Sequence, residues 1–249
     1  MQWTDEAIVL RLGKFRETDL WVRFLSREKG LVTAFAFGGS RSRRRFTGCL
    51  DVFNVISVSV ASSRDGRFLN MREATLLEGP ERLRRDWQRQ GMAANCVRFL
   101  EAMDVPPDNA GAAFELMRGT MHLLEQEGAA LTPLTPMLFR FRLAADQGYV
   151  PDLSACARCG RPLDELAQVH FVVGEGSACC PECRRHGDMS LSLGQEALDV
   201  LAKVKEYSPE AWDSLSPSPE SARQAGRLID AFVRYHLGLE WINGRFKAM

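Results

Sequence analysis

The sequence predicts an α+β protein, with an N-terminal five-stranded barrel followed by an all-helical domain that carries a four-cysteine zinc module. Three observations lead to this fold class. Short alternating apolar segments, separated by turn residues, occupy residues 1–79. Apolar residues recur at helical spacing after Gly79-Pro80. Two C-x-x-C pairs interrupt that helical pattern. We therefore expect a barrel domain at 1–79 and a helical domain at 80–249, with the module at 152–187 inserted in the second.

Five short strands in fewer than 80 residues are typical of a small closed or partly closed barrel. Their size fits the OB-fold, whereas an SH3-like barrel remains the competing arrangement because strand count does not separate the two. The first strand is expected around Ile8–Leu12, where apolar positions alternate. The others are expected at Leu20–Ser26, Leu31–Phe37, Leu50–Val60 and Arg67–Leu77.

Apolar stripes with a period near 3.6 residues predict helices on both sides of the module. The stripes hold many Met and Phe residues, which we expect to form core rather than to bind a cofactor. Three sequence signals mark helix starts: Thr132 as an N-cap, Ser192 with Gln195 as a capping box, and Ser218 before Pro219.

Charge is distributed unevenly along the chain. The 32 basic and 32 acidic residues cancel, which argues against a generic nucleic-acid binder. Residues 1–80, however, hold 13 basic and 9 acidic side chains, so a basic face on the barrel is expected. No apolar segment approaches the ~20 residues of a membrane helix, and the start lacks the pattern of a signal peptide. We therefore expect a cytoplasmic protein with no membrane partner.

The spacing of four cysteines predicts one structural Zn²⁺. Cys156 and Cys159 form one C-x-x-C pair, Cys180 and Cys183 form the other, and 20 residues separate them. Four thiolates suit tetrahedral Zn²⁺ and close its coordination shell, which leaves no position for a catalytic water. The alternative is a set of four buried free thiols. Three residues, Cys179, His170 and His186, are reserve ligands.

Basic residues cluster in and near the first three expected strands. Arginine binds phosphate oxygens with two parallel hydrogen bonds, and basic residues interleaved with aromatics are how OB-folds hold single strands. The candidate DNA-binding residues are Arg11, Lys14, Arg16, Arg23, Arg41, Arg43, Arg44 and Arg45; the candidate stacking residues are Trp21, Phe35, Phe37 and Phe46. The alternative is a solvated basic loop beside aromatics that belong to the core.

No catalytic motif accompanies these residues. The sequence lacks a Ser-His-Asp set, a P-loop and an H-E-x-x-H motif. The four histidines are scattered, and none neighbours a plausible nucleophile. We therefore expect a binding protein rather than an enzyme.

The order of these elements along the chain, together with several short motifs, resembles that of the RecO family of bacterial recombination mediators. The most specific motif is Gly148-Tyr149-Val150-Pro151-Asp152-Leu153, which runs directly into Cys156-x-x-Cys159-Gly160. The other matching segments are Glu17-Thr18-Asp19, Glu28-Lys29-Gly30, Gly38-Gly39-Ser40-Arg41 and Leu50-Asp51-Val52-Phe53. One departure is Phe37, where many family members carry a basic residue before the glycine, and this weakens one phosphate contact.

The resemblance implies an N-terminal OB domain and a helical domain with a zinc module. It also implies binding of single- and double-stranded DNA, annealing of complementary strands, and no nucleotide hydrolysis. With RecR, such a protein helps RecA replace single-strand binding protein (SSB), and it docks the acidic C-terminal tail of SSB on its helical domain. The expected location is the bacterial cytoplasm, in association with the nucleoid.

A docking site for an acidic peptide with an apolar end needs an apolar pocket with a basic rim. We expect this pocket between the helices of residues 90–145, with Arg98, Arg140 and Arg142 as rim candidates, because they interrupt or flank apolar stripes. The alternative is that these arginines are solvated or paired with nearby Glu.

Two other classes of function share some of these features. A zinc-ribbon RNA-binding or transcription-associated module would have the same barrel and cysteines, and would prefer structured RNA to single-stranded DNA. A metalloenzyme would need an open zinc site, and its turnover would follow zinc occupancy.

Overall fold

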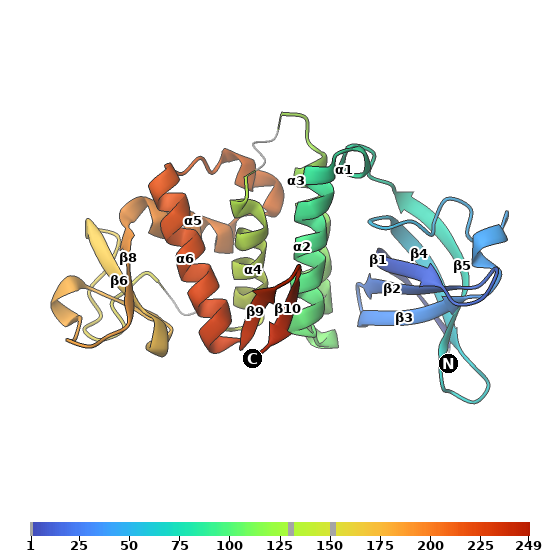
Figure 1. Ribbon diagram of the computed structural model, residues 1–249, viewed down its shortest axis with the longest axis horizontal. Coiled ribbons are helices and arrows are strands. Elements are labelled where there is room, and N and C mark those ends of the chain that lie inside the picture. The colour runs from blue at the N-terminus through green and yellow to red at the C-terminus, as the bar shows by residue number, and fades with distance from the viewer. Residues whose placement is uncertain (1, 129–131, 150–152) are drawn as a thin grey trace. The chain divides into compact units, whose positions relative to one another are not determined.

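A computed structural model of the 249-residue chain describes residues 2–128, 132–149 and 153–249 (Figure 1). The chain forms two compact units. One comprises Met1–Gln90 with Met103–Met121, and the other comprises Gly91–Ala102 with His122–Met249. The predicted α+β fold class is confirmed. None of the described helices is both long and apolar enough to cross a membrane. The predicted division of the sequence at residue 79 stays a prediction.

Five strands of the first unit close into a barrel in the order β1-β2-β3-β5-β4 (Figure 1). The strands are β1 Gln2–Lys14, β2 Leu20–Ser26, β3 Gly30–Ala36, β4 Val55–Ser62 and β5 Leu69–Glu78. The long strand β1 takes part in two pairings: Gln2–Ile8 pairs with β4 and Ala7–Lys14 pairs with β2. A register shift between Val9 and Arg11 lies where the pairing changes. Such an irregularity bends a strand, as closure of a small barrel requires.

Alternation along the strands separates the barrel core from the surface. In β3, Val32, Ala34 and Ala36 are buried, and the residues between them point outward. Phe24 of β2 is fully buried in the same core cluster. The face formed by Leu31, Thr33 and Phe35 is therefore the outer face of the barrel.

The fourth strand starts five residues later than predicted. Residues 50–54 form a turn in which Phe53 has φ of 70°, a left-handed conformation that a strand does not contain. The side-chain amide of Asn54 donates hydrogen bonds to the carbonyls of Gly48 and Cys49, both at 2.9 Å. These bonds satisfy backbone groups that a strand would have paired, so the apolar run of the sequence is divided between turn and strand.

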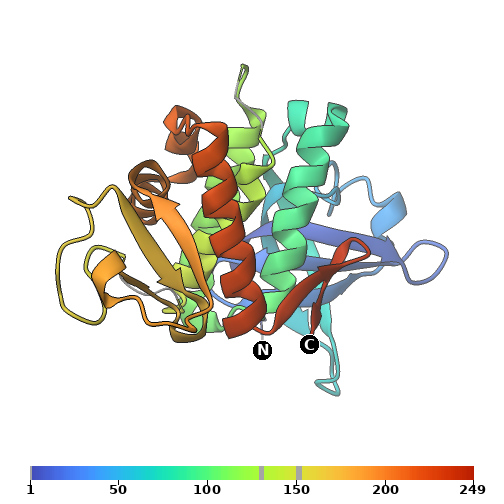
Figure 2. The same cartoon turned by 60° about the vertical axis from the view of Figure 1, so that its left-hand side comes forward.

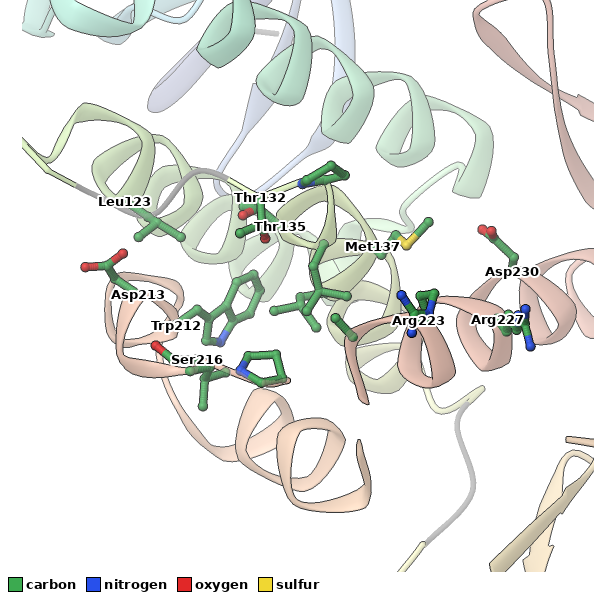
Figure 3. Close-up of a pocket in the computed structure, with 17 residues that line it drawn as sticks. Leu123, Thr132, Thr135, Met137, Trp212, Asp213, Ser216, Arg223, Arg227 and Asp230 are labelled. Carbon is green, nitrogen blue, oxygen red and sulfur yellow. The ribbon is translucent and has the colours of Figure 1, made fainter. Parts of the chain in front are cut away.

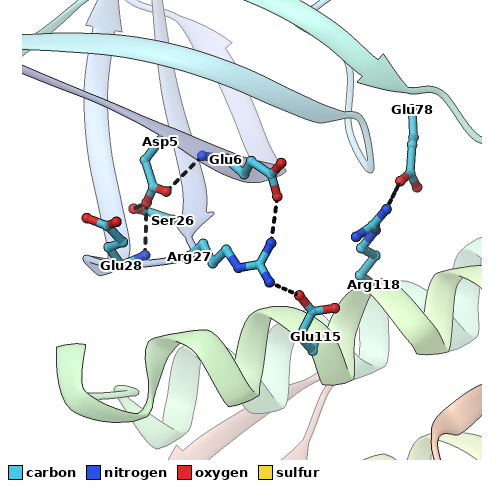
Figure 4. Close-up of polar contacts among 8 residues, drawn as sticks. All are labelled: Asp5, Glu6, Ser26, Arg27, Glu28, Glu78, Glu115 and Arg118. Carbon is cyan, nitrogen blue, oxygen red and sulfur yellow. Dashed lines mark hydrogen bonds and ion pairs between the residues drawn. The ribbon is translucent and has the colours of Figure 1, made fainter.

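Ion pairs join helix α3 (Ala110–Glu125) to the barrel within the first unit (Figure 4). Arg27 binds Glu6 of β1 at 2.9 Å and Glu115 of α3 at 2.7 Å. Arg118 of α3 binds Glu78 of β5, and this hydrogen bond raises the pKa of the arginine. Because these groups are partly exposed, each pair contributes at most about 1 kcal/mol to stability. Their geometry nevertheless sets which face of α3 meets the strands.

The second unit contains helices, a small sheet and a C-terminal hairpin (Figures 1 and 2). Its α-helices are α4 Leu134–Asp146, α5 Gln195–Glu206 and α6 Pro219–His236. Gly91–Ala102 of helix α2 (Trp87–Met103) also belong to this unit, whereas the short helix α1 (Arg82–Arg85) belongs to the first unit. The strands are β6 Gln168–Val172, β7 Ser177–Cys179 and β8 Ser190–Gly194, in the order β7-β6-β8, and the hairpin of β9 Leu239–Ile242 and β10 Arg245–Ala248. Among the described residues, the 3-10 helices are η1 Gly39–Arg41, η2 Pro107–Asn109, η3 Val173–Glu175, η4 Pro181–Cys183 and η5 Pro209–Ser214.

One of the three predicted helix caps is confirmed and two are wrong. Ser218 caps α6 by accepting a hydrogen bond from the Ser221 N–H at 3.3 Å. Helix α4 begins instead after Pro133, with no side-chain cap. Ser192 lies in β8, whose pairing continues to Gly194, so the N-cap of α5 is that glycine. The strand pairing in β8 competed with the local capping signal and determined the structure there.

The barrel core gives the first testable prediction. Changing Phe24 to Ala should lower the free energy of unfolding by about 3–5 kcal/mol, because it leaves a cavity in a packed core. Phe37→Ala, at a residue 36% exposed, is the matched control and should cost much less. Urea denaturation of both variants checks the difference, and equal losses would show that the core is not where the structure puts it.

Candidate metal centre and nucleic-acid interface

The four cysteines of the two C-x-x-C pairs lie together in the second unit. Their sulfur atoms are all within 4.8 Å of one another, and the cluster can hold a metal ion. Cys159 Sγ and Cys180 Sγ are 3.8 Å apart. Zn–S bonds of about 2.3 Å in a tetrahedron put neighbouring sulfurs about 3.8 Å apart. The donor set and the spacing therefore both fit Zn²⁺.

Tight turns position the sulfurs. Gly160 follows the first pair with φ of 74°, a conformation that favours glycine, and donates to the Cys156 carbonyl at 2.8 Å. In the second pair, Cys183 donates its N–H to the Cys180 carbonyl at 3.1 Å, within η4. Each turn brings two sulfurs to one side of the backbone.

The local hydrogen bonds affect the acidity of the thiols. Burial raises the pKa of Cys156, but backbone N–H groups, above all that of Cys180, outweigh it and lower the value to about 6. Hydrogen bonds with Cys159 and Cys180, together with burial, raise the pKa of Cys183 to about 12. A bound divalent cation would replace the shared protons, because the thiolate is the form that ligates metals.

Arg158, which the sequence did not single out, connects several segments of the metal module by hydrogen bonds. Its side chain is only 11% exposed although it lies between two candidate ligands. The guanidinium donates to the Cys183 carbonyl at 2.5 Å, to Asp188 at 2.8 Å and to Glu175 at 2.6 Å. It thus joins the two cysteine turns and supplies a positive charge beside the thiolates. Hydrogen bonds of this kind orient metal ligands.

The reserve ligands lie outside the four-sulfur cluster. Cys179 is buried in β7, where burial raises the pKa of its thiol. His170 Nδ1 lies 3.4 Å from the Ser192 hydroxyl, and burial lowers the pKa of the imidazole. His186 is exposed. Of the groups that the structure describes around the cluster, the four C-x-x-C cysteines alone form a possible metal-binding set.

The basic loop of the first unit, residues 38–46, is hydrogen-bonded to the β1–β2 connection at its start, and its arginine side chains are exposed to solvent. Gly38 donates its N–H to Asp19 Oδ1 at 2.8 Å, and Ser40 donates its N–H and its hydroxyl to the Thr18 carbonyl, each at 3.1 Å. The side chains of Arg41, Arg43 and Arg44 are exposed and have no polar partner in the described parts of the chain. These three guanidiniums can therefore bind a ligand without first breaking an ion pair.

Arg45 differs from the other arginines of the loop. Its guanidinium donates to the Phe37 carbonyl at 2.6 Å and lies 5.0 Å from the centre of the Phe46 ring. Phe46 is 3% exposed and belongs to the barrel core, so its expected role as a stacking residue is wrong. The backbone beside this ring is bonded to β5, because the Ala74 N–H donates to the Arg45 carbonyl at 2.8 Å, and the ring packs in the core cluster.

The remaining basic candidates lie on or next to the outer face of β1 and β2. Arg11 is directly opposite Arg23 in the pairing of these strands, and Arg23 donates to the Thr33 hydroxyl at 3.1 Å. Lys14 is exposed at the end of β1, and Arg16 lies 5.4 Å from the centre of the Phe15 ring. The structure thus brings Arg11 and Arg23 to one face, whereas Lys14 is at the end of β1 opposite Leu20 and the loop arginines stand on the β3–β4 connection.

The second unit contains an apolar pocket of about 600 Å³ (Figure 3). Its lining comes from Leu123 of α3, from α4 with the two residues before it, from η5 with the segment after it, and from α6. Leu134, Leu138 and Trp212 provide apolar surface, and Arg223 and Arg227 of α6 provide the basic groups. These two arginines were not predicted; their spacing of four residues on one exposed helix face was the available signal.

None of the three predicted rim arginines lines this pocket. Arg140 is 6% exposed and bonds Asp230 at 3.1 Å and Asn95 at 2.9 Å. Arg142 bonds Asp146 at 2.8 Å and two backbone carbonyls, and Arg98 lies 5.8 Å from the Trp241 ring. Their part in partner binding stays a prediction.

Comparison with known proteins agrees with this geometry. Residues 1–80 match the family model described as Recombination protein O N terminal, and residues 84–245 match Recombination protein O C terminal. The chain belongs to the RecO family. Proteins named DNA repair protein RecO are similar to it over almost their whole length. That of Nitratidesulfovibrio vulgaris (strain DP4) is 48% identical over 100% of both chains, and that of Oleidesulfovibrio alaskensis is 50% identical over 99% of both. The corresponding protein of Lawsonia intracellularis is 43% identical over 99% of both. The expected RecO resemblance is thereby confirmed.

The metal centre of this RecO-family chain gives the second testable prediction. Cys156→Ser and Cys183→Ser should each lose most bound zinc and destabilise residues 153–187, because metal binding and local folding are linked. Cys179→Ser is the matched control and should keep about one zinc per chain. Elemental analysis and limited proteolysis measure the two effects. Full zinc in both ligand variants, or loss of zinc in the control, would contradict this ligand set.

Proposed function

We propose that this RecO-family chain is a non-catalytic mediator of DNA repair that binds and anneals single-stranded DNA. It also binds duplex DNA and, with RecR, assists RecA loading on strands covered by SSB. One observation carries the DNA-binding part: three exposed arginines without polar partners in the described chain, on a loop anchored to a closed barrel. The names of the RecO relatives, all DNA repair proteins, support the process.

Phosphate binding by this loop follows from charge and geometry. The chain has no net charge, so attraction for DNA must come from a local field. Guanidinium groups that are already solvent-exposed and unpaired exchange water and counterions for phosphate oxygens. Because such contacts read the backbone and not the bases, binding should be independent of sequence. A protein that pairs arbitrary complementary strands requires this property.

We propose one structural Zn²⁺ on the four cysteines. When bound, the ion would supply a tetrahedral cross-link between the two cysteine turns. Four thiolates leave no open coordination position, so the module serves folding rather than hydrolysis. Arg158 would hold the second turn in place through the Cys183 carbonyl.

We place the docking site for the acidic SSB tail at the pocket between α4, η5 and α6. The apolar lining suits the hydrophobic end of such a tail, and Arg223 and Arg227 suit its carboxylates. Arg223 is hydrogen-bonded to Glu220 at 2.6 Å. Arg227 is exposed, and within the described chain it has only a charge interaction with that glutamate. Arg227 is therefore the stronger candidate for a carboxylate partner.

The basic loop gives the third prediction. Replacing Arg41, Arg43 and Arg44 by Ala should flatten the dependence of log affinity on log salt by about 2 units on single strands, if each contacts one phosphate. Affinity should fall equally for unrelated sequences, and annealing should fall with it. Fluorescence anisotropy at several salt concentrations measures the slope. A variant with the wild-type slope and wild-type annealing would show that DNA binds elsewhere.

The pocket gives the fourth prediction. Arg227→Glu should weaken binding of a fluorescent acidic peptide with an apolar C-terminal end by about tenfold or more, because a carboxylate partner is replaced by a repulsive charge. Arg98→Glu is the comparison, since Arg98 lies outside the pocket lining. Weakened binding in the second variant alone would transfer the site to the surface around Arg98.

A further inference from the structure

A groove lies between the metal module and helix α5 of the second unit. It encloses about 600 Å³. One wall is the segment that frames the first C-x-x-C pair, with Leu153 before the pair and Pro162 after it, and the other wall is one face of α5. Among the described residues, its lining shares none with that of the apolar pocket described above. It is therefore a second, separate binding surface, here called the α5 groove.

Apolar side chains form the floor of the α5 groove. Leu153 and Leu198 are 8% and 5% exposed, and Ala155, Pro162 and Ala202 complete the apolar lining. Leu198 and Ala202 are about one helical turn apart, so both lie on the face of α5 that lines the groove. This floor suits an apolar side chain of a partner.

The rim of the groove is acidic. Asp164 of the module and Asp199 and Glu206 of α5 line it, together with one basic residue, Lys205. Asp164 and Glu206 are exposed and have no polar partner in the described parts of the chain. Asp199 accepts a hydrogen bond from the Gln195 side chain at 3.0 Å. Three carboxylates against one ammonium leave the rim negative, so that it attracts a cationic group.

The loop that carries the first cysteine pair also builds one wall of the groove. Ala155 and Pro162 pair in an isolated β-bridge, and the Cys156 N–H donates to the Arg161 carbonyl at 2.7 Å. These bonds close the loop that holds Cys156 and Cys159. Because the wall and the cysteine turn are parts of one loop, a metal ion on the cysteines would also hold this wall in place.

We propose that the α5 groove docks a segment of a partner protein in which lysine or arginine flanks an apolar side chain. The apolar side chain covers Leu198 and Ala202, and the cationic groups bind the carboxylates of the rim. Asp199 and Glu206 are about two helical turns apart, which is about 10 Å along α5. An extended segment covers this distance in about three residues. The basic residues of the partner segment are therefore about three positions apart.

Charge is the reason for choosing this occupant. The acidic rim repels nucleic acid, and it repels the acidic peptide that suits the pocket beside Arg223 and Arg227. The inference goes beyond the proposed function, because it gives the chain a second protein-binding surface of opposite charge. Since the two linings share no described residue, an acidic and a basic partner segment can be bound at the same time.

The experiment uses a phage-displayed library of random nine-residue peptides, selected on the immobilised full chain with zinc present. Enriched peptides should carry an apolar residue between two lysines or arginines. Fluorescence anisotropy then measures one enriched peptide on wild-type protein and on an Asp164→Lys/Glu206→Lys variant. Affinity for this variant should fall about tenfold or more, because attraction at both walls becomes repulsion.

Glu17→Lys/Glu73→Lys is the matched control. Both glutamates are exposed, lie outside the lining of the groove, and have no polar partner in the part of the chain that the structure describes. The control changes the net charge by the same amount as the groove variant, and its affinity should stay within about twofold of wild type. An equal loss in both variants would overturn the groove, because the effect would then come from total charge.

Ala202→Trp tests the floor without changing any charge. This alanine is exposed on α5, so the larger side chain fills the groove without entering the helix core. Peptide binding should be lost while elemental analysis still finds the wild-type zinc content. Wild-type affinity in both groove variants would overturn the proposal. So would a selection that enriches no peptide class, or acidic peptides alone, which the other pocket explains. DNA binding is measured separately and is unaffected by any of these outcomes.

Discussion

Closure of the barrel through β1 is the constraint on which the arrangement of its outer face depends. One strand pairs with β2 along one part of its length and with β4 along another, and the register shift after Val9 lets it turn between them. With both edges of β1 used, the sheet has little freedom to slip. A one-residue slip would exchange the buried and outward faces of every paired strand. The position of Phe35 on the outside, and of Phe24 on the inside, therefore follows from this closure.

The metal module depends on a different constraint. Its sheet has only three short strands, so the buried side chains of Val169, Phe171 and Leu193 belong to a small core, and cross-links add to its stability. The four cysteines would supply one cross-link with a metal ion bound, and Arg158 supplies another through Cys183, Asp188 and Glu175. A third contact attaches the module to α6, where the His236 ring bonds the Val173 carbonyl at 2.6 Å. Gly176 faces the same ring, and a Cβ there would come within 2.9 Å of it.

Arginines serve opposite purposes in different parts of this chain. Arg41, Arg43 and Arg44 keep their charge exposed, which leaves it available to a polyanion. Arg140 is buried and the side chain of Arg158 is only 11% exposed, and their guanidinium NH groups join distant segments. Buried guanidiniums need partners, since an unpaired buried charge is strongly destabilising. Local sequence indicated the exposed use but not the internal one: Arg140 was expected at the rim of a pocket, and Arg158 was not singled out.

The sequence by itself determined the features that depend on neighbouring residues. Alternation indicated five strands, the C-x-x-C spacing indicated a metal cluster, and Ser218 before Pro219 indicated the start of α6. Each of these signals acts within one turn or one strand, where backbone geometry relates spacing directly to position.

Tertiary structure alone decided the features made by distant segments. Examples are the left-handed turn at Phe53, the burial of Phe46, the pocket rimmed by Arg223 and Arg227, and the contacts of Phe15 and Phe68 with Phe35. A residue pattern records whether a side chain is apolar, but not which distant surface will cover it. That outcome depends on barrel closure and helix packing, which are decided by the summed free energy of many long-range contacts.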